Sequence, residues 1–246
     1  MKCLIVAAGL GSRLRSLSES KPLAPVNGVP LIEHVIGRAA AGGASDFVVV
    51  TGHRADEVEA LLESVQARLG VPIRAVRTPD WSRPNGLSVA TGAEAMDSDY
   101  LLLMCDHLFD PAIVARLLEA EAGDGVTLAI DRDLANPFTD LEDATRVETA
   151  PDGAIVRIGK GLDPYNAIDT GIFRAGPALR EAILADTGEG GGGSLTEGVR
   201  RLARLGLART RDIDGLWWLD VDDPPSHALA EAALSCAPPP LRGNAA

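Results

Sequence analysis

Short apolar runs alternate with amphipathic stretches along the first hundred residues. The runs "LIVAA" at 4–8, "FVVVT" at 47–51 and "YLLLM" at 100–104 predict strands buried on both faces, as in a parallel sheet. Between these runs, apolar residues recur at helical spacing, and proline starts and glycine stops mark the ends. The remaining elements expected in this half are helices at 30–41, 55–70 and 87–96 and a short strand at 73–76.

The second half of the chain has a less regular pattern. We expect strands at 125–131, 153–160, 166–173, 207–213 and 216–221, and helices at 177–185 and 195–205. The glycine-rich segment 186–194 predicts a flexible loop. Alternating strands and helices predict an α/β, Rossmann-like, doubly wound and mostly parallel mixed sheet with helices on both faces. With no repeat or linker, we expect one domain over residues 1–235 and a disordered, proline-rich tail over 236–246.

Composition narrows the class of protein. The net charge of -12 argues against nucleic acid or an anionic membrane as a partner. No apolar run reaches the ~18–20 residues that span a bilayer, so we expect no membrane insertion by this chain. The N-terminal apolar stretch is too short for a signal peptide, and three cysteines without metal-ligand spacing indicate free thiols. These features together predict a cytoplasmic protein.

The first strand runs into "GLGSRL", and a lysine before a proline follows eight residues after the arginine. A glycine turn between a strand and a helix is a common phosphate site. A dinucleotide fingerprint would need a glycine where Leu14 stands, so a dinucleotide-dependent oxidoreductase is excluded. A Walker loop would need a wider glycine spacing and a Lys-Ser/Thr pair. Of 23 basic residues only Lys2, Lys21 and Lys160 are lysine, which weakly favours a specific role for the latter two.

The stretch A-A-G-x-G-S-R-L followed by K-P resembles the N-terminal signature of the sugar-phosphate nucleotidyltransferase superfamily. The resemblance implies that the turn wraps a nucleoside triphosphate while arginine and lysine grip its phosphates. The residues that take these roles by resemblance are Ala8, Gly9, Gly11, Ser12, Arg13 and Lys21. It also implies a Mg²⁺ site made of Asp106, after the central strand, and Asp222 in "WWLDVDDPPS", with Asp220 as the alternative. Carboxylate oxygens are the ligands that Mg²⁺ prefers.

Later segments are similar to one branch, the CTP:inositol-1-phosphate cytidylyltransferases. They are "RPNGLSVATG", "DHLFDP", "LEDATRV", "IGKGLDPYNAIDTGIF" and "GGSLTEGVRRLA", and the likeness runs from about residue 1 to 224. The resemblance implies Asn85, Gly86 and Ser88 near the cytidine. It implies Lys160 at the acceptor phosphate, and at the acceptor hydroxyls Asp131, Asp143, Asn166 and Asp169. Turn or strand-end solvation is an equally good reading of Asp131 and Asp143, and His107 is expected to be only a neighbour of Asp106.

The resemblance therefore implies a Mg²⁺-dependent transfer of a cytidylyl group from CTP to inositol 1-phosphate. The expected catalytic residues are Arg13, Lys21 and Lys160, and the product would feed phospholipid biosynthesis through a CDP-alcohol transferase. Other acceptors stay open: phosphocholine, an aminoalkylphosphonate or a hexose 1-phosphate. A catalytically silent nucleotide-binding regulator is the alternative from another class. The sequence carries no signal for the oligomeric state.

Overall fold

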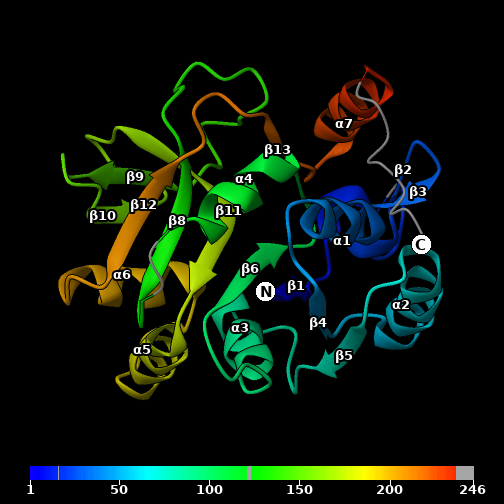
Figure 1. Cartoon of the computed structure of the whole chain (residues 1–246), viewed down its shortest axis with the longest axis horizontal. Coiled ribbons are helices and arrows are strands. Elements are labelled where there is room, and N and C mark those ends of the chain that lie inside the picture. The colour runs from blue at the N-terminus through cyan, green and yellow to red at the C-terminus, as the bar shows by residue number, and fades with distance from the viewer. Residues whose placement is uncertain (16, 121–122, 237–246) are drawn as a thin grey trace.

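The computed structural model describes residues 1–15, 17–120 and 123–236, and from residue 237 onward the expected tail lies outside them. Within these residues nine strands form one sheet, in the order β10-β9-β11-β6-β1-β4-β5, with β8 paired to β11 and β12 paired to β8 (Figure 1). One half is parallel and the other is built on the long antiparallel strand β11. The expected Rossmann-like mixed sheet with helices on both faces is confirmed.

The strands of this sheet are β1 (Lys2–Ala7), β4 (Asp46–Thr51), β5 (Ile73–Arg77), β6 (Tyr100–Met104), β8 (Val126–Asp131), β9 (Arg146–Thr149), β10 (Ile155–Gly159), β11 (Ala167–Ala175) and β12 (Ala208–Asp212). Two further pairs lie outside it: β2 (Pro25–Val26) with β3 (Val29–Pro30), and β7 (His107–Phe109) with β13 (Trp218–Asp220). The helices are α1 (Leu31–Ala41), α2 (Ala55–Leu69), α3 (Asn85–Ala93), α4 (Pro111–Leu118), α5 (Pro177–Gly188), α6 (Leu195–Arg204) and α7 (Pro224–Cys236).

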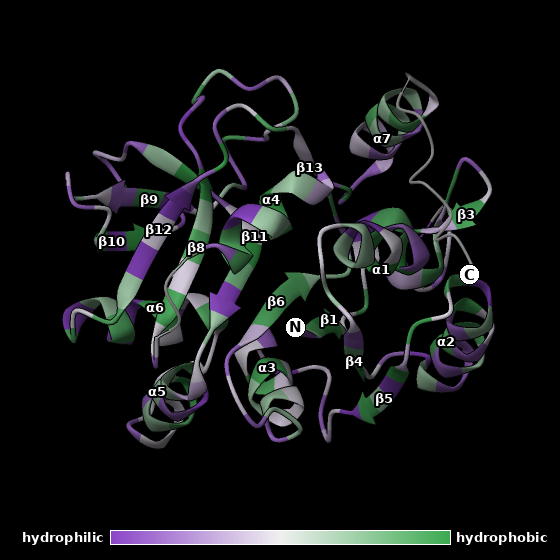
Figure 2. Cartoon of the chain, viewed as in Figure 1, coloured by the Kyte–Doolittle hydropathy of each residue, from purple (hydrophilic) through white to green (hydrophobic). Residues whose placement is uncertain are grey.

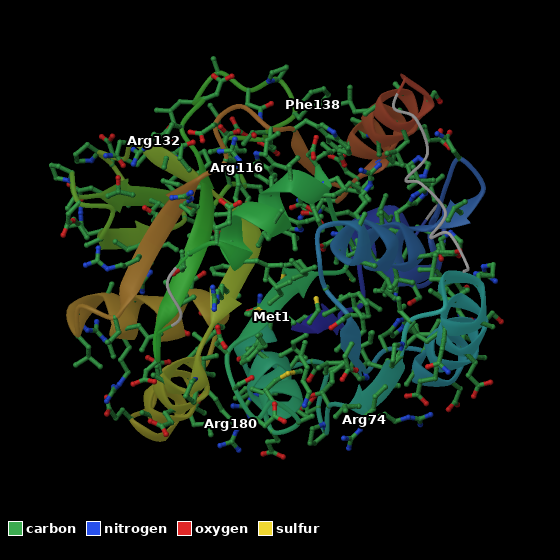
Figure 3. All side chains as sticks on the ribbon, viewed as in Figure 1. Met1, Arg74, Arg116, Arg132, Phe138 and Arg180 are labelled. Atoms are coloured by element: carbon green, nitrogen blue, oxygen red, sulfur yellow. The ribbon has the colours of Figure 1, made fainter. Side chains whose placement is uncertain are left out.

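Two apolar layers hold the helices against the sheet. Side chains alternate across each strand, so that Ile5 of β1 packs in the layer with α1, α2, α4 and α7, whereas Leu4 packs in the layer with α3, α5 and α6. Figure 2 shows the apolar character of the central strands and the polar outer faces of α2 and α5. Charged side chains such as those of Arg74 and Arg180 project from the rim of the molecule (Figure 3). Among the described residues, no helix combines the length and apolar character that a bilayer crossing requires.

The parallel strands β1, β4 and β6 bring their carboxyl ends to one edge of the sheet. The register pairs Ala7 of β1 with Thr51 of β4, and Val6 of β1 with Met104 of β6. In open α/β sheets this edge is where ligands bind. The β7–β13 pair stands directly beyond it, with Asp220 opposite His107 in the ladder. Residues from the middle and the end of the chain therefore meet beside the glycine turn.

Several elements differ from the expected ones. The glycine turn opens only a short 3-10 helix (η1, Ser12–Leu14), and a second one (η2, Lys21–Leu23) carries the lysine. Helix α5 continues to Gly188 and so takes up the first residues of the expected loop 186–194. Helices α4 and α7 and strands β7 and β9 were not expected, because each is short or begins with prolines that hide its periodicity.

Helix α3 lies unusually close to the sheet at Gly92. A Cβ built there would lie 2.3 Å from Leu4 Cδ1 and 2.6 Å from Val50 Cγ2. We therefore expect Gly92→Ala to lower the free energy of unfolding by about 1 kcal/mol, because overpacking outweighs the gain in helix propensity. Gly37→Ala in α1 is the matched control, since a Cβ there meets Leu69 Cδ1 at 4.0 Å and nothing nearer.

Gly37→Ala should raise the free energy of unfolding by about 0.5–1 kcal/mol. Urea unfolding of both variants and the wild type measures the two changes. An equal gain in stability for both would contradict the close approach of α3.

Candidate active site

The glycine turn after β1 forms one wall of a cavity of about 310 Å³ at the carboxyl edge of the sheet. Gly11 adopts φ +61°, and a Cβ there would lie 2.4 Å from Lys21 Cβ. Only glycine leaves room for Lys21 to pass directly beneath the turn. The residues that line this cavity are Val6, Gly9, Gly11, Ser12, Arg13, Lys21, Asn85, Met104, Cys105, Asp106 and Asp222.

The ammonium of Lys21 is surrounded by three carboxylates. Its Nζ donates to Asp106 Oδ2 at 2.5 Å and to Asp222, and lies 3.8 Å from Asp220 Oδ1. The Lys21 side chain is only 8% exposed. Burial alone would lower the pKa of Lys21, but the three negative charges outweigh it and hold that pKa well above its usual range. Lys21 is therefore a permanent cation here.

His107 links two of these carboxylates. Its Nδ1 bonds Asp106 Oδ1 at 2.7 Å and lies 3.8 Å from Asp220 Oδ1. The ring is stacked on Trp218, with centroids 6.1 Å apart. Burial would lower the pKa of His107, but the two carboxylates outweigh it and raise this pKa to about 9. The expectation that His107 is only a neighbour of Asp106 is therefore incomplete, because it also orients this carboxylate.

The carboxylates could hold a divalent cation. Carboxylate oxygens of Asp106 and Asp220 lie within 4.8 Å of each other and of a ring nitrogen of His107. Asp220 Oδ1 is buried and has no hydrogen-bond partner among the residues that the structure describes. An orphaned buried acceptor among hard oxygen donors suits Mg²⁺. Asp222 lies beside them and pairs with Lys21 and Arg13.

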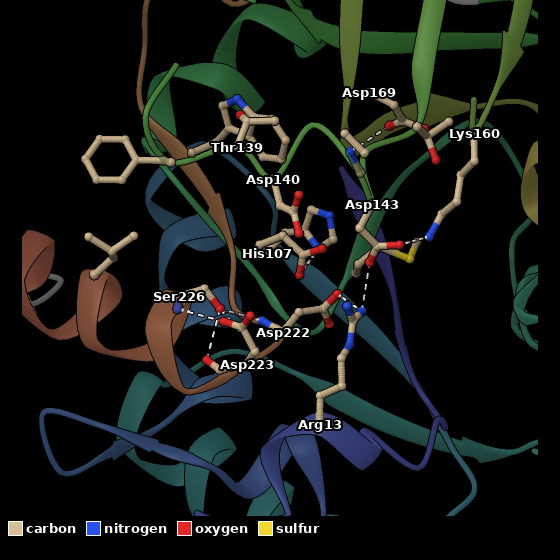
Figure 4. A pocket seen from close by; sticks show the side chains of 18 of the residues that line it. Arg13, His107, Thr139, Asp140, Asp143, Lys160, Asp169, Asp222, Asp223 and Ser226 are labelled. Atoms are coloured by element: carbon tan, nitrogen blue, oxygen red, sulfur yellow. Dashed lines mark hydrogen bonds and ion pairs between the residues drawn. The ribbon is translucent and has the colours of Figure 1, made fainter. Parts of the chain in front are cut away.

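A second cavity of about 410 Å³ adjoins the first and shares Arg13, Asn85, Met104 and Asp222 with it. Its far wall comes from the segment between β8 and β9, which carries Phe138 (Figure 3), and from the start of α7. Figure 4 shows the ion pairs in this cavity, where Asp143 joins Arg13 to Lys160. The two cavities thus form a continuous polar site with cations in both parts.

The expected acceptor residues separate into two groups. Asp143, Lys160 and Asp169 line the second cavity. Asp131 accepts hydrogen bonds from Trp218 Nε1 at 2.9 Å and from Asn136 Nδ2 at 2.7 Å, and it is 3% exposed. Asn166 is bonded to the backbone N–H and carbonyl of Thr149. Neither Asp131 nor Asn166 lines either of these two cavities, because these bonds occupy their side chains.

Of the three residues expected near the cytidine, only Asn85 lines the two cavities. Its Oδ1 accepts from the Leu195 N–H at 3.1 Å. Gly86 lies against the loop between α5 and α6, where a Cβ would meet Gly193 O at 2.3 Å. Ser88 is buried in α3. Ala8, which was expected in the glycine turn, accepts a hydrogen bond at its carbonyl from the His53 N–H. Gly86, Ser88 and Ala8 therefore shape the wall that positions Asn85 and the glycine turn.

Sequence reasoning missed the cavity residues supplied by the β8–β9 segment and by α7. They are Pro137, Phe138, Thr139, Asp140, Ala144, Thr145, Pro225, Ser226 and Leu229. A signal for α7 was present: Asp223, followed by prolines, accepts from the Ser226 N–H at 2.8 Å and so caps the helix. For the β8–β9 segment no local pattern points to the cavity.

The fold and site define a class of α/β protein with a glycine turn, buried cations and carboxylates at the carboxyl edge of a mixed sheet, next to a second polar cavity. Residues 3–205 match the model of the MobA-like NTP transferase domain, so the chain belongs to this family. It is a nucleotidyltransferase domain, and the resemblance expected from the sequence is confirmed.

Individual relatives are similar over most of the chain. A bifunctional IPC transferase and DIPP synthase of Rubrobacter xylanophilus is 37% identical over 92% of this chain and 50% of the relative. A CMP-5'-(3-aminopropyl)phosphonate synthase of Streptomyces rubellomurinus is 34% identical over 96% of this chain and 39% of the relative. The chain thus spans half or less of these curated relatives.

The inositol-1-phosphate CTP transferase structure from T. maritima has a TM-score of 0.81 with 22% identity, covering 96% of this chain and 97% of that one. At this identity the likeness shows the fold.

The bonds of Asp131 give it a structural role that can be tested. Asp131→Ala leaves the buried Trp218 Nε1 without an acceptor, so we expect the free energy of unfolding to fall by about 2–4 kcal/mol. Asp133→Ala, an exposed neighbour, should lose less than about 1 kcal/mol. Urea unfolding measures both. A stable Asp131→Ala protein that has lost acceptor binding would instead return Asp131 to the acceptor site.

Asp169 should make stability depend on pH. Burial raises the pKa of Asp169 from 3.8 to about 6. A hydrogen bond from the Gly171 N–H lowers this pKa but does not cancel the effect of burial. Between these values the folded protein keeps a proton that the unfolded chain has lost, so stability falls as pH rises through this window. Because the side chain is partly accessible, we expect about 1–2 kcal/mol.

Thermal melting of the wild type and Asp169→Asn between pH 4 and pH 7 checks this. The decline should be about 1–2 kcal/mol smaller in Asp169→Asn. It should not vanish, because burial also raises the pKa of Asp220 to about 7 and this carboxyl titrates in the same window. Asp140→Asn should decline as the wild type does. An equal decline in all three proteins would show that another group accounts for it.

Proposed function

We propose that this chain transfers a cytidylyl group from CTP to inositol 1-phosphate, giving CDP-inositol and pyrophosphate. The observation that carries the proposal is the pair of joined cavities, with Arg13 and Lys21 on one side and Lys160 on the other. The similarity to proteins named IPC transferase supports cytidylyl and inositol chemistry, and the family supports nucleotidyl transfer.

The nucleotide occupies the cavity under the glycine turn. Arg13 and Lys21 bind the β- and γ-phosphates, and the backbone of the turn packs against them. Asn85 lies where both cavities meet, so its amide can bind the nucleotide next to the reacting phosphate.

Mg²⁺ fits the carboxylates on this wall. Asp106 would hold it together with Asp222 or with Asp220, whose buried Oδ1 has no hydrogen-bond partner among the described residues. When bound, the ion neutralises charge on the nucleotide phosphates and on the departing pyrophosphate. Lys21 remains beside these carboxylates and stabilises the same developing charge.

The acceptor occupies the second cavity. Lys160 binds its phosphate, and Asp169 accepts hydrogen bonds from its hydroxyls. One oxygen of that phosphate attacks the α-phosphorus of CTP, and the bond from this phosphorus to the β-phosphate oxygen breaks, so that pyrophosphate leaves. No general base is needed, because a phosphate monoester with a second pKa near ~6 is largely dianionic at neutral pH.

An aminoalkylphosphonate is the second candidate for the acceptor. The 34% identity to a CMP-5'-(3-aminopropyl)phosphonate synthase favours it specifically. The carboxylate of Asp169 in the second cavity could bind an ammonium group as well as hydroxyls. Both candidates use the same nucleotide and metal residues and differ only in the alcohol or alkyl part of the acceptor.

Pyrophosphate release with Mg²⁺ tests the function. We expect release with CTP and inositol 1-phosphate, little with ATP, GTP or UTP, and none after chelation of the metal. Phosphocholine, 3-aminopropylphosphonate and glucose 1-phosphate complete the acceptor panel. Release with 3-aminopropylphosphonate alone would replace the acceptor, and no release with any pair would contradict nucleotidyl transfer by this chain.

Lys21→Ala is the variant that ties this activity to the site. It should lower kcat/KM by about 10²–10³, because it removes a buried cation next to the developing charge. Arg15→Ala is the control, because Arg15 is an exposed cation six residues before Lys21. Circular dichroism confirms that each variant is folded.

A further inference from the structure

Asp143 lies between two cations, Arg13, which lines both cavities, and Lys160, which lines only the second of the two. Its Oδ2 accepts from Arg13 Nη2 at 2.9 Å, and its Oδ1 accepts from Lys160 Nζ (Figure 4). Arg13 follows the glycine turn of the first cavity, whereas Lys160 follows β10. Each carboxylate oxygen is therefore taken by a different cation.

These two cations alone hold the Asp143 side chain. Among the described residues no backbone N–H and no hydroxyl donates to it, and the side chain is 34% exposed. The neighbouring Asp140 differs, because its Oδ1 accepts from the backbone N–H of Glu142. Hydrogen bonds from Lys160 and from Arg13 hold the pKa of Asp143 below its ordinary value, so it is charged at neutral pH.

A carboxylate held only by cations in a ligand cavity occupies the place of a bound anion. A phosphate monoester carries about two charges and three acceptor oxygens, and so it competes well against one carboxylate for the same donors. Asp143 sits on the long segment between β8 and β9, and it is bonded to no neighbour in that segment. The segment can therefore release this side chain without breaking its own hydrogen bonds.

We propose that Asp143 is an internal substitute for the acceptor phosphate, and that it makes the binding of acceptor and nucleotide cooperative. The inference rests on the proposed function, because that function puts the acceptor phosphate at Lys160. Without nucleotide, an incoming acceptor must displace Asp143 from both Arg13 and Lys160. When the triphosphate has taken Arg13, only the pair with Lys160 remains to be broken.

The coupling must be reciprocal, so it can be measured from the nucleotide side. The experiment titrates wild type, Asp143→Asn and Asp140→Asn with α,β-methylene CTP and Mg²⁺, each with and without saturating inositol 1-phosphate. This analogue cannot release pyrophosphate, so binding is measured without turnover. Asp140→Asn removes the same charge from the same cavity wall without touching Arg13 or Lys160, and so it controls for the general effect of charge.

We expect the wild type and Asp140→Asn to bind the analogue at least about fivefold more tightly when the acceptor is present. Asp143→Asn should bind it several-fold more tightly than the wild type without acceptor, and the effect of the acceptor should fall below about twofold. Weaker nucleotide or acceptor binding by Asp143→Asn would show that the carboxylate is a direct ligand and would overturn the proposal. Unchanged coupling in that variant would overturn it too.

The failure of the proposed acceptor has a different signature. In that case inositol 1-phosphate changes nucleotide binding in none of the three proteins. The comparison without acceptor still decides the role of Asp143 at Arg13, because it needs only the nucleotide. If Asp143→Asn and Asp140→Asn gained the same nucleotide affinity, the gain would come from the loss of a negative charge in general. That result would contradict the proposal that Asp143 substitutes for the acceptor phosphate.

Discussion

The ion cluster around Lys21 constrains every other part of this site. A buried ammonium is tolerated only because Asp106, Asp220 and Asp222 compensate it, and buried carboxylates in turn need the cation. These residues come from the start, the middle and the end of the chain. The parallel sheet must therefore bring β1 and β6 to the same edge, and β13 must pair with β7 directly beyond it.

The cluster also explains why the two cavities have mixed charge. Each cation that could bind a phosphate is paired with a carboxylate, as Arg13 is with Asp222 and Lys160 is with Asp143. The protein has a net charge of -12, and these ion pairs with carboxylates hold the side chains of Arg13 and Lys160 in place. Incoming phosphates exchange one set of ion pairs for another, which limits both the desolvation penalty and the reorganisation of the site.

Much of the nucleotide side could be predicted from sequence, because its determinants are local. A buried strand, the glycine turn and Lys21 lie within about twenty residues, and Asp106 follows a strand that its apolar run identifies. The acceptor side could not be predicted in the same way. Asp131 and Asp169 both stand in strands with similar hydrophobic patterns. Asp131 accepts a hydrogen bond from Trp218, whereas Asp169 lines the second cavity. Only the long-range pairing of β13 separates the two cases.

The division of labour between the two cavities has an evolutionary consequence. They share only four of the residues that line them in the described part of the chain, and the β8–β9 segment and α7 supply ten of the 24 residues that line the second cavity. Neither of these belongs to the parallel strands that support the glycine turn. Substitutions, insertions or deletions in them can change the partner molecule while the triphosphate grip stays intact. Proteins with this fold can thus acquire new acceptors through sequence changes confined to the β8–β9 segment and α7.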